Sequence, residues 1–196
     1  MDGLRVVPTA DGSSTLYSER FKATYHSVNG ALTESMHVFI KSGFEAILQN
    51  KKNVDVLEIG MGTCLNAALT GWVAQMYGAR VHYTGIELFP PTVEVLNSTG
   101  YHAVLEPECA ELWEKIVAAS ASEPVPVSTW VTVSKLYVDF IGWNPNNMYD
   151  LVYFDAFAPD DQPEMWSIEN FNKLFNALKP NGALVTYSAK GLVKQN

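Results

Sequence analysis

The sequence predicts an α/β fold in which helices cover both faces of a mostly parallel sheet. Apolar runs rich in β-branched residues alternate with helical patterns along most of the chain. The run from Val54 breaks into a turn holding Gly60 and Gly62, and a helical pattern follows at once. Later runs end at or just before an acid, at Glu87 and Asp155. Because ligands bind at the carboxyl ends of parallel strands, this fold places the turn and both acids at one site.

The first 50 residues are predicted to be an extension that precedes the sheet. Two short extended runs flank Asp11-Gly12, a pair typical of hairpin turns. From Ala31 the apolar residues recur at helical spacing until Gly43 interrupts the pattern, and another turn or two reaches Leu48. We expect this extension to cover one end of the sheet.

The remaining elements are assigned by their apolar period and by proline and glycine. Residues 101–105 are expected to be extended and residues 122–127 to form a loop. Helices are predicted at residues 65–76, 92–96, 107–119 and 163–178. Strands are predicted at residues 54–58, 80–87, 130–138, 150–155 and 183–187. We expect the strand order 3-2-1-4-5, in a single domain of residues 1–196 with an extension over 1–50 and a core over 51–196.

Composition and charge limit the partners. The chain has 196 residues and a formal net charge of −8, so contact with nucleic acid is expected to be local rather than spread over a basic surface. The acidity also serves solubility. No apolar run approaches the length of about 20 residues that spans a bilayer. The two cysteines suit a reducing compartment, so we expect a cytoplasmic protein without a membrane partner. Nothing in the sequence sets the oligomeric state.

The spacing in the glycine turn selects the type of nucleotide. A dinucleotide fingerprint requires a third glycine at position 65, where this chain has leucine. The observed spacing is an acid at Glu58, then Gly60 and Gly62, with Cys64 in the third alternate position. This pattern resembles motif I of class I S-adenosylmethionine-dependent methyltransferases, whose cofactor is therefore expected here. The alternative is a tight strand-to-helix turn without a ligand.

Positions in the predicted fold then assign the cofactor-binding residues. Glu87 ends the second strand, where a carboxylate can accept hydrogen bonds from both ribose hydroxyls. Asp139 could accept from the adenine amino group, with Phe140 packed on the ring. For both acids, the alternative to a cofactor-binding role is a solvated side chain at the end of a strand. The predicted cofactor-binding set is Glu58, Gly60, Gly62, Thr63, Asn66, Glu87, Asp139 and Phe140.

The segment after the fourth strand supplies the predicted catalytic and substrate-binding residues. Asp155 ends a strand that should neighbour the first, so its carboxylate would point toward the transferred methyl group, although a capping role is the alternative. The small residues at 156 and 158 leave space for a substrate, and Phe157 offers an apolar or stacking surface. The predicted substrate-binding residues are Phe157, Pro159 and Lys190. The four histidines do not form a ligand set, so no metal is predicted.

Several longer motifs point to one family. From about residue 9 to the C-terminus, the chain resembles the methyltransferase domain of the MnmC/MnmD family of enzymes that modify the wobble uridine of tRNA. The segment DAFAPDDQPEMW over residues 155–166 carries most of this resemblance. The other motifs lie at residues 11–15, 25–27, 30–31, 34–35, 37–39 and 186–191.

The resemblance implies methyl transfer from S-adenosylmethionine to the aminomethyl nitrogen of 5-aminomethyl-(2-thio)uridine in tRNA. Asp155 would orient the amine and accept its proton. Phosphate contacts are expected from Lys190 and Lys194 and from Arg20 and Lys22. In two-domain members an FAD-dependent oxidase domain makes the amine, so a separate oxidase acting upstream is an expected partner.

Two departures from the family pattern keep other functions open. Cys64 replaces the third glycine and could crowd the cofactor, and the sequence ends at Asn196. Related chains continue with a helix and an antiparallel strand pair, so we expect an exposed sheet edge and a truncated or partner-completed sheet. The alternatives are an N-methyltransferase acting on a small amine and a cofactor-binding protein without turnover.

Overall fold

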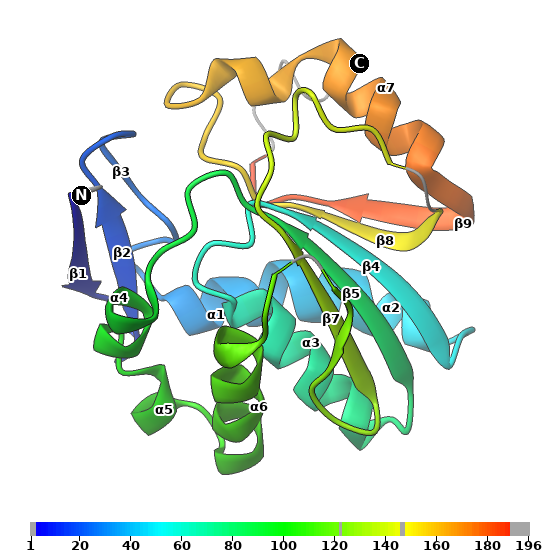
Figure 1. Ribbon diagram of the computed structural model, residues 1–196, viewed down its shortest axis with the longest axis horizontal. Coiled ribbons are helices and arrows are strands. Elements are labelled where there is room, and N and C mark those ends of the chain that lie inside the picture. Colours follow the sequence, from blue (N-terminus) through cyan, green and yellow to red (C-terminus); the bar gives the residue numbers. More distant parts are fainter. Residues whose placement is uncertain (1–2, 122, 146–147, 189–196) are drawn as a thin grey trace.

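The computed structural model describes residues 3–121, 123–145 and 148–188. Its centre is a six-stranded sheet with the order β6-β7-β5-β4-β8-β9 (Figure 1). All neighbouring strands are parallel except β6, which pairs antiparallel with β7. The strands are β4 (Asn53–Ile59), β5 (Arg80–Ile86), β6 (Val125–Pro126), β7 (Val131–Leu136), β8 (Tyr149–Phe154) and β9 (Leu178–Val185). The predicted order 3-2-1-4-5 is therefore confirmed, and one edge strand is added to it.

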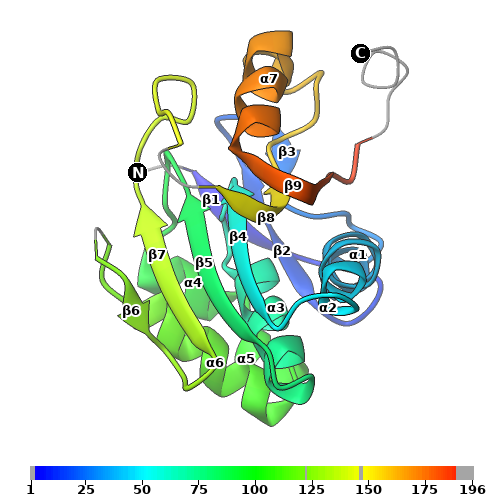
Figure 2. The same ribbon diagram turned by 90° about the vertical axis from the view of Figure 1, so that its right-hand side faces the viewer.

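Alternation along the central strand divides the core between the two faces of the sheet. In β4, Val54 and Val56 face one hydrophobic cluster while Leu57 and Ile59 face another. The first face is covered by a long N-terminal helix and by α3 and α6, and the second by α7 (Figures 1 and 2). The helices are α1 (Ala31–Ser35), the π-helix η1 (Met36–Phe44), α2 (Glu45–Leu48), α3 (Leu65–Met76), α4 (Val93–Ser98), α5 (Tyr101–Val104), α6 (Pro107–Ala118), the 3₁₀-helix η2 (Pro163–Trp166) and α7 (Ile168–Ala177).

The N-terminal hairpin is confirmed. A small antiparallel sheet contains β1 (Leu4–Pro8), β2 (Ser14–Ser18) and β3 (Ala23–Thr24). The Asp11 carboxylate accepts hydrogen bonds from the Ser13 amide at 3.0 Å and from the Thr33 amide at 2.9 Å. Since Thr33 lies in the first turn of α1, one side chain both closes the hairpin turn and caps that helix.

The predicted break at Gly43 is wrong. α1, η1 and α2 form one continuous helix through this residue. A Cβ atom at position 43 would lie 3.1 Å from Val185 and 3.5 Å from the ring of Tyr153. The glycine therefore allows the helix to pack closely on β8 and β9, and the lack of a side chain serves tertiary contact rather than termination.

Three other expectations are corrected. Residues 101–104 are helical, because Tyr101 is buried and its hydroxyl donates to the Ser14 carbonyl oxygen at 2.9 Å. The expected loop at 122–127 contains β6, whose Pro126 is accommodated on the edge of the sheet. The predicted helix 163–178 is split at Ser167, whose side chain caps α7 by accepting from the Asn170 amide.

Among the described residues, no helix has the length and apolar character needed to cross a membrane.

Candidate functional site

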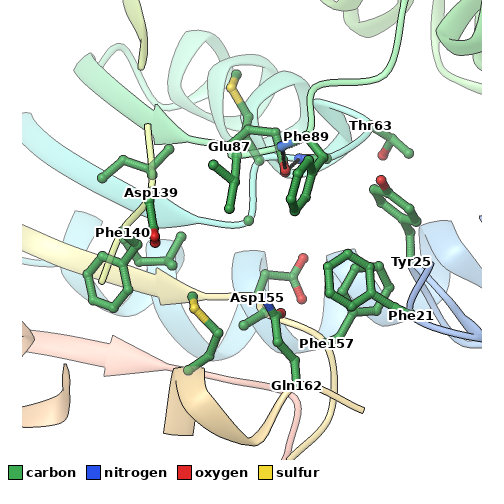
Figure 3. Close-up of a pocket in the computed structure, with 18 of the residues that line it drawn as sticks. Phe21, Tyr25, Thr63, Glu87, Phe89, Asp139, Phe140, Asp155, Phe157 and Gln162 are labelled. Atoms are coloured by element: carbon green, nitrogen blue, oxygen red, sulfur yellow. Dashed lines mark hydrogen bonds between the residues drawn. The ribbon is translucent and has the colours of Figure 1, made fainter. Parts of the chain in front are cut away.

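A cavity of about 370 Å³ lies at the carboxyl ends of β4, β5, β7 and β8. In Figure 3, Asp139 and Phe140 lie on one side, Phe21, Tyr25 and Phe157 on the other, and Glu87 and Asp155 between them. The predicted site residues that line it are Gly60, Gly62, Thr63, Asn66, Glu87, Asp139, Phe140, Asp155 and Phe157. Glu58 and Pro159 do not line it, and Lys190 and Lys194 lie outside the described residues.

The glycine turn between β4 and α3 forms one wall of the cavity. Gly60 and Gly62 have φ values of 86° and 47°, which side chains disfavour. A Cβ atom at Gly60 would lie 2.5 Å from the carbonyl oxygen of Asp155, and one at Gly62 would lie 2.8 Å from the Tyr25 ring. The Gly62 amide donates to the Glu87 carboxylate at 3.0 Å. These contacts join the turn to both acidic strand ends.

Cys64 also adopts a left-handed conformation, with φ of 63°. Position 64 thus has the same left-handed backbone as Gly60 and Gly62. A residue with a side chain is strained in this conformation by about 1–2 kcal/mol. Cys64 packs in the core and does not line the cavity, and burial raises the pKa of its thiol to about 12. The side chain of Cys64 therefore does not narrow the cavity, and its effect in the structure is the left-handed backbone.

Asn66, at the start of α3, joins two carboxylates. Its amide group donates to Glu58 at 2.8 Å and to Asp155 at 2.9 Å. Glu58 also accepts from the Tyr83 hydroxyl at 2.8 Å, and burial raises the pKa of Glu58 to about 8. Both amide hydrogens of the Asn66 side chain point at carboxylates, so its side-chain carbonyl oxygen takes no part in these hydrogen bonds. That oxygen is buried and has no hydrogen-bond partner within the described part of the chain.

The cavity wall is acidic. Its lining includes the acidic residues Glu87, Asp139, Asp155 and Glu164, and the basic residue Arg20. Burial, followed by the charges of Glu58 and Glu34, raises the pKa of Asp155 well above its ordinary range. Burial likewise raises the pKa of Glu87. A cationic ligand would relieve this repulsion, so the site favours positive charge.

Four aromatic rings form the opposite wall. Phe21 stacks on Phe157 with ring centroids 4.5 Å apart and planes at 25°, and Tyr25 meets Phe157 edge-on at 5.1 Å. Phe89 lies 6.1 Å from Phe21, and the Arg20 guanidinium lies 4.0 Å above the Phe89 ring. Sequence reasoning assigned no site role to Phe21, Tyr25 or Phe89. The position of Phe89 two residues beyond Glu87 was the available signal, since strand ends form the site.

Comparisons with known proteins agree with this geometry. A family model described as S-adenosyl-L-methionine-dependent methyltransferase matches residues 109–196. The tRNA 5-methylaminomethyl-2-thiouridine biosynthesis bifunctional protein MnmC of Burkholderia multivorans is 27% identical over 195 residues, which cover 92% of this chain and 29% of that protein. The protein of the same name from Aeromonas salmonicida is 27% identical over 93% of this chain and 30% of its own length. Over more than nine tenths of its length this chain is similar to these two MnmC proteins, and over residues 109–196 it is similar to the methyltransferase family.

A solved structure supports the fold. The crystal structure of MnmC2 from Aquifex aeolicus superposes with a TM-score of 0.72 at 22% identity, over 100% of this chain and 63% of that one. The chain spans less than a third of the length of these two relatives.

The cavity fits the cofactor that the family model names. S-adenosylmethionine has a sulfonium and an ammonium group, both positive, and the wall is acidic. The glycine turn lines the cavity at Gly60 and Gly62.

Proposed function

We propose that this MnmC-like domain transfers a methyl group from S-adenosylmethionine to the aminomethyl nitrogen of 5-aminomethyl-(2-thio)uridine at the wobble position of tRNA. The observation that carries the proposal is the position of Asp155. Its carboxylate lies on the cavity wall between the glycine turn and the aromatic rings, and Asn66 fixes one of its oxygens. The name of the MnmC relatives supports the nucleoside, because 5-methylaminomethyl-2-thiouridine is the product of such a transfer.

The proposed cofactor-binding residues surround the turn. Gly60 and Gly62 line the cavity, and Glu87 would accept hydrogen bonds from the ribose hydroxyls while it accepts one from the Gly62 amide. Asp139 and Phe140 lie at the far side of the cavity, where adenine recognition is proposed. Glu58 would act indirectly, because it touches Asn66 and lies behind the wall. The bound cofactor supplies the methyl group.

Asp155 is proposed to position the substrate amine and to take its proton. Only a neutral amine can attack a methyl group, so a proton must leave the aminomethyl nitrogen. The raised pKa of Asp155 makes its ionised carboxylate a stronger proton acceptor than an exposed aspartate. The rest of the rate enhancement would come from holding the two reactants in line. Phe157 would contact the substrate from the aromatic wall.

The decisive test is methylation of tRNA that carries 5-aminomethyl-2-thiouridine, followed by nucleoside mass spectrometry. We expect the methylaminomethyl nucleoside with the wild-type protein and its loss with Asp155→Asn. Absence of any methylated nucleoside at saturating cofactor would contradict the proposal. Glu114→Gln, which changes an exposed glutamate of α6, is the matched control and should keep full activity.

One observation favours a second candidate function. The chain has a net charge of −8, and the cavity holds four carboxylates, which suits a small cationic amine better than a polyanion. Under this alternative, methylation of free 5-aminomethyluracil would be independent of salt. tRNA methylation should instead weaken steeply with salt, because binding RNA releases counterions. A cofactor-binding protein without turnover remains the third alternative, and it would bind S-adenosylhomocysteine yet methylate neither substrate.

We also propose an upstream enzyme, a single-domain organisation and a cytoplasmic location. An FAD-dependent oxidase would supply the amine, and the MnmC relatives are named as bifunctional proteins. Residues 1–50 and 51–196 would act together as one domain, because the rings of Phe21 and Tyr25 pack against Phe157. Both cysteines are free and buried, which suits a reducing cytoplasm.

A further inference from the structure

We propose that Phe21, Phe89 and Phe157 form a stacking site for the pyrimidine ring of the target nucleotide, and that the turn between β2 and β3 is the part of the protein that receives the RNA. This inference rests on the proposed function and names the residues that would distinguish RNA from a small amine.

Three separate segments bring these rings together. Phe21 comes from the β2–β3 turn, Phe89 from the loop after β5 and Phe157 from the loop after β8. Phe21 and Phe157 are parallel enough to continue a stack, at 4.5 Å and 25°. All three rings line the cavity and are only partly buried. Core rings such as Phe154 are fully buried, so the open surface of this trio is not explained by packing.

The rings lie beside the proposed acceptor of the proton. Asp155 lines the same cavity as Phe21 and Phe157, and in Figure 3 its carboxylate points toward their rings. A pyrimidine stacked on this wall would bring a short aminomethyl substituent toward that carboxylate. Aromatic side chains are the usual platform for unpaired bases, because every base has a π-face. A flexible aliphatic amine gains no such stacking, so the trio favours a planar substrate.

The charge of the cavity wall favours entry of the base and keeps the phosphates outside. The cavity wall carries four carboxylates and repels a phosphate, whereas an uncharged ring with a cationic substituent can enter. Arg20 and Lys22 are exposed on either side of Phe21 in the same turn. Lys22 has φ of 54°, and this left-handed residue turns the chain tightly next to Phe21. We therefore place the RNA backbone over the β2–β3 turn and the flipped base inside the cavity.

The test compares an anticodon stem-loop RNA that has a base at the wobble position with the same RNA made abasic there. Binding is measured by fluorescence anisotropy with S-adenosylhomocysteine present. We expect wild type to bind the intact RNA about tenfold more tightly than the abasic RNA, because only the intact RNA has a base that can stack on the three rings. Phe21→Leu and Phe89→Leu should each bring that ratio close to one.

Matched variants separate stacking from general effects. Phe175→Leu changes a ring on α7 that is 74% exposed and should leave the ratio unchanged. Lys22→Gln should weaken both RNAs equally and lower the salt dependence. Retained binding of S-adenosylhomocysteine and an unchanged Tm show that each variant is folded.

The outcomes distinguish this inference from the proposed function. A ratio near one in wild type, or an unchanged ratio in both folded leucine variants, overturns the stacking site even if tRNA is methylated. A ratio that falls in the leucine variants supports the stacking site even if no methylated nucleoside forms, in which case only the proposed reaction fails.

Discussion

Replacement of Glu58 by glutamine is expected to flatten the pH dependence of the unfolding free energy. Glu58 is buried beneath the cavity wall, where it accepts hydrogen bonds from Asn66 and Tyr83. Glutamine has the same shape and can accept from the Asn66 amide while it donates to the Tyr83 hydroxyl oxygen. The substitution therefore removes the ionisation but retains the hydrogen bonds.

The magnitude follows from the raised pKa. Burial moves the pKa of Glu58 from its ordinary value of 4.5 to about 8. Between these pH values the folded state holds a proton that the unfolded chain has released. Its stabilising contribution is fully present below pH 4.5 and is lost as the pH rises through the folded pKa. Each pH unit in this window lowers the unfolding free energy by about 1.4 kcal/mol, which gives about 2 kcal/mol between pH 6 and 7.5.

Urea unfolding at several pH values between 5.5 and 8.5 measures this effect. Wild type should lose stability steadily across the range. The Glu58→Gln variant should lose about 2 kcal/mol less between pH 6 and 7.5. Glu114→Gln removes an exposed carboxylate and should follow the wild-type slope. Parallel slopes for wild type and Glu58→Gln would refute the reasoning, because they would mean that Glu58 has the same proton affinity in both states.

Four shorter predictions test the site. Asp155→Asn should lower kcat/KM for tRNA by about a hundredfold or more while calorimetry shows retained S-adenosylhomocysteine binding; equal turnover would remove Asp155 from the chemistry. Gly60→Ala should lower the unfolding free energy by about 2 kcal/mol or more, because its φ is 86° and the new Cβ meets the Asp155 carbonyl oxygen; an unchanged Tm contradicts this. Cys64→Gly should be more stable than Cys64→Ala by about 1 kcal/mol in urea unfolding, the reverse of the usual helix preference. Calorimetry should find that affinity for S-adenosylmethionine, relative to S-adenosylhomocysteine, which lacks the sulfonium charge, rises with pH as the wall carboxylates ionise, and a constant ratio would contradict the electrostatic argument.

Local sequence was sufficient for the main strands and helices. Strongly periodic segments such as α3 and α6 were predicted within a residue or two, because their apolar faces repeat at a fixed spacing. The errors occurred where a distant contact decides the conformation. Tyr101 is helical because its ring packs on Trp113 and its hydroxyl reaches Ser14. Gly43 continues a helix because the chain of β9 lies against it.

The candidate site likewise contains residues that local sequence predicted and residues that it missed. Glycine spacing and acids at strand ends predicted Gly60, Gly62, Glu87, Asp139 and Asp155, and the structure places all of them on one cavity. These positions follow from topology, since parallel strands end at the same edge of the sheet. Of the aromatic wall only Phe157 was predicted; Phe21, Tyr25 and Phe89 were missed, because they come from separate segments that have no shared sequence pattern.

The sequence by itself determined the strand order, the turn between β4 and α3, and the acids that meet there, since period and glycine spacing are local properties of the chain. Tertiary structure alone decided what those residues experience. Glu58 carries a raised pKa because the core closes over it, and Asp155 is oriented because Asn66, in the first turn of α3, donates to its carboxylate at 2.9 Å. The left-handed geometry at Cys64 likewise became visible only in three dimensions, because backbone strain depends on what the fold requires of a position.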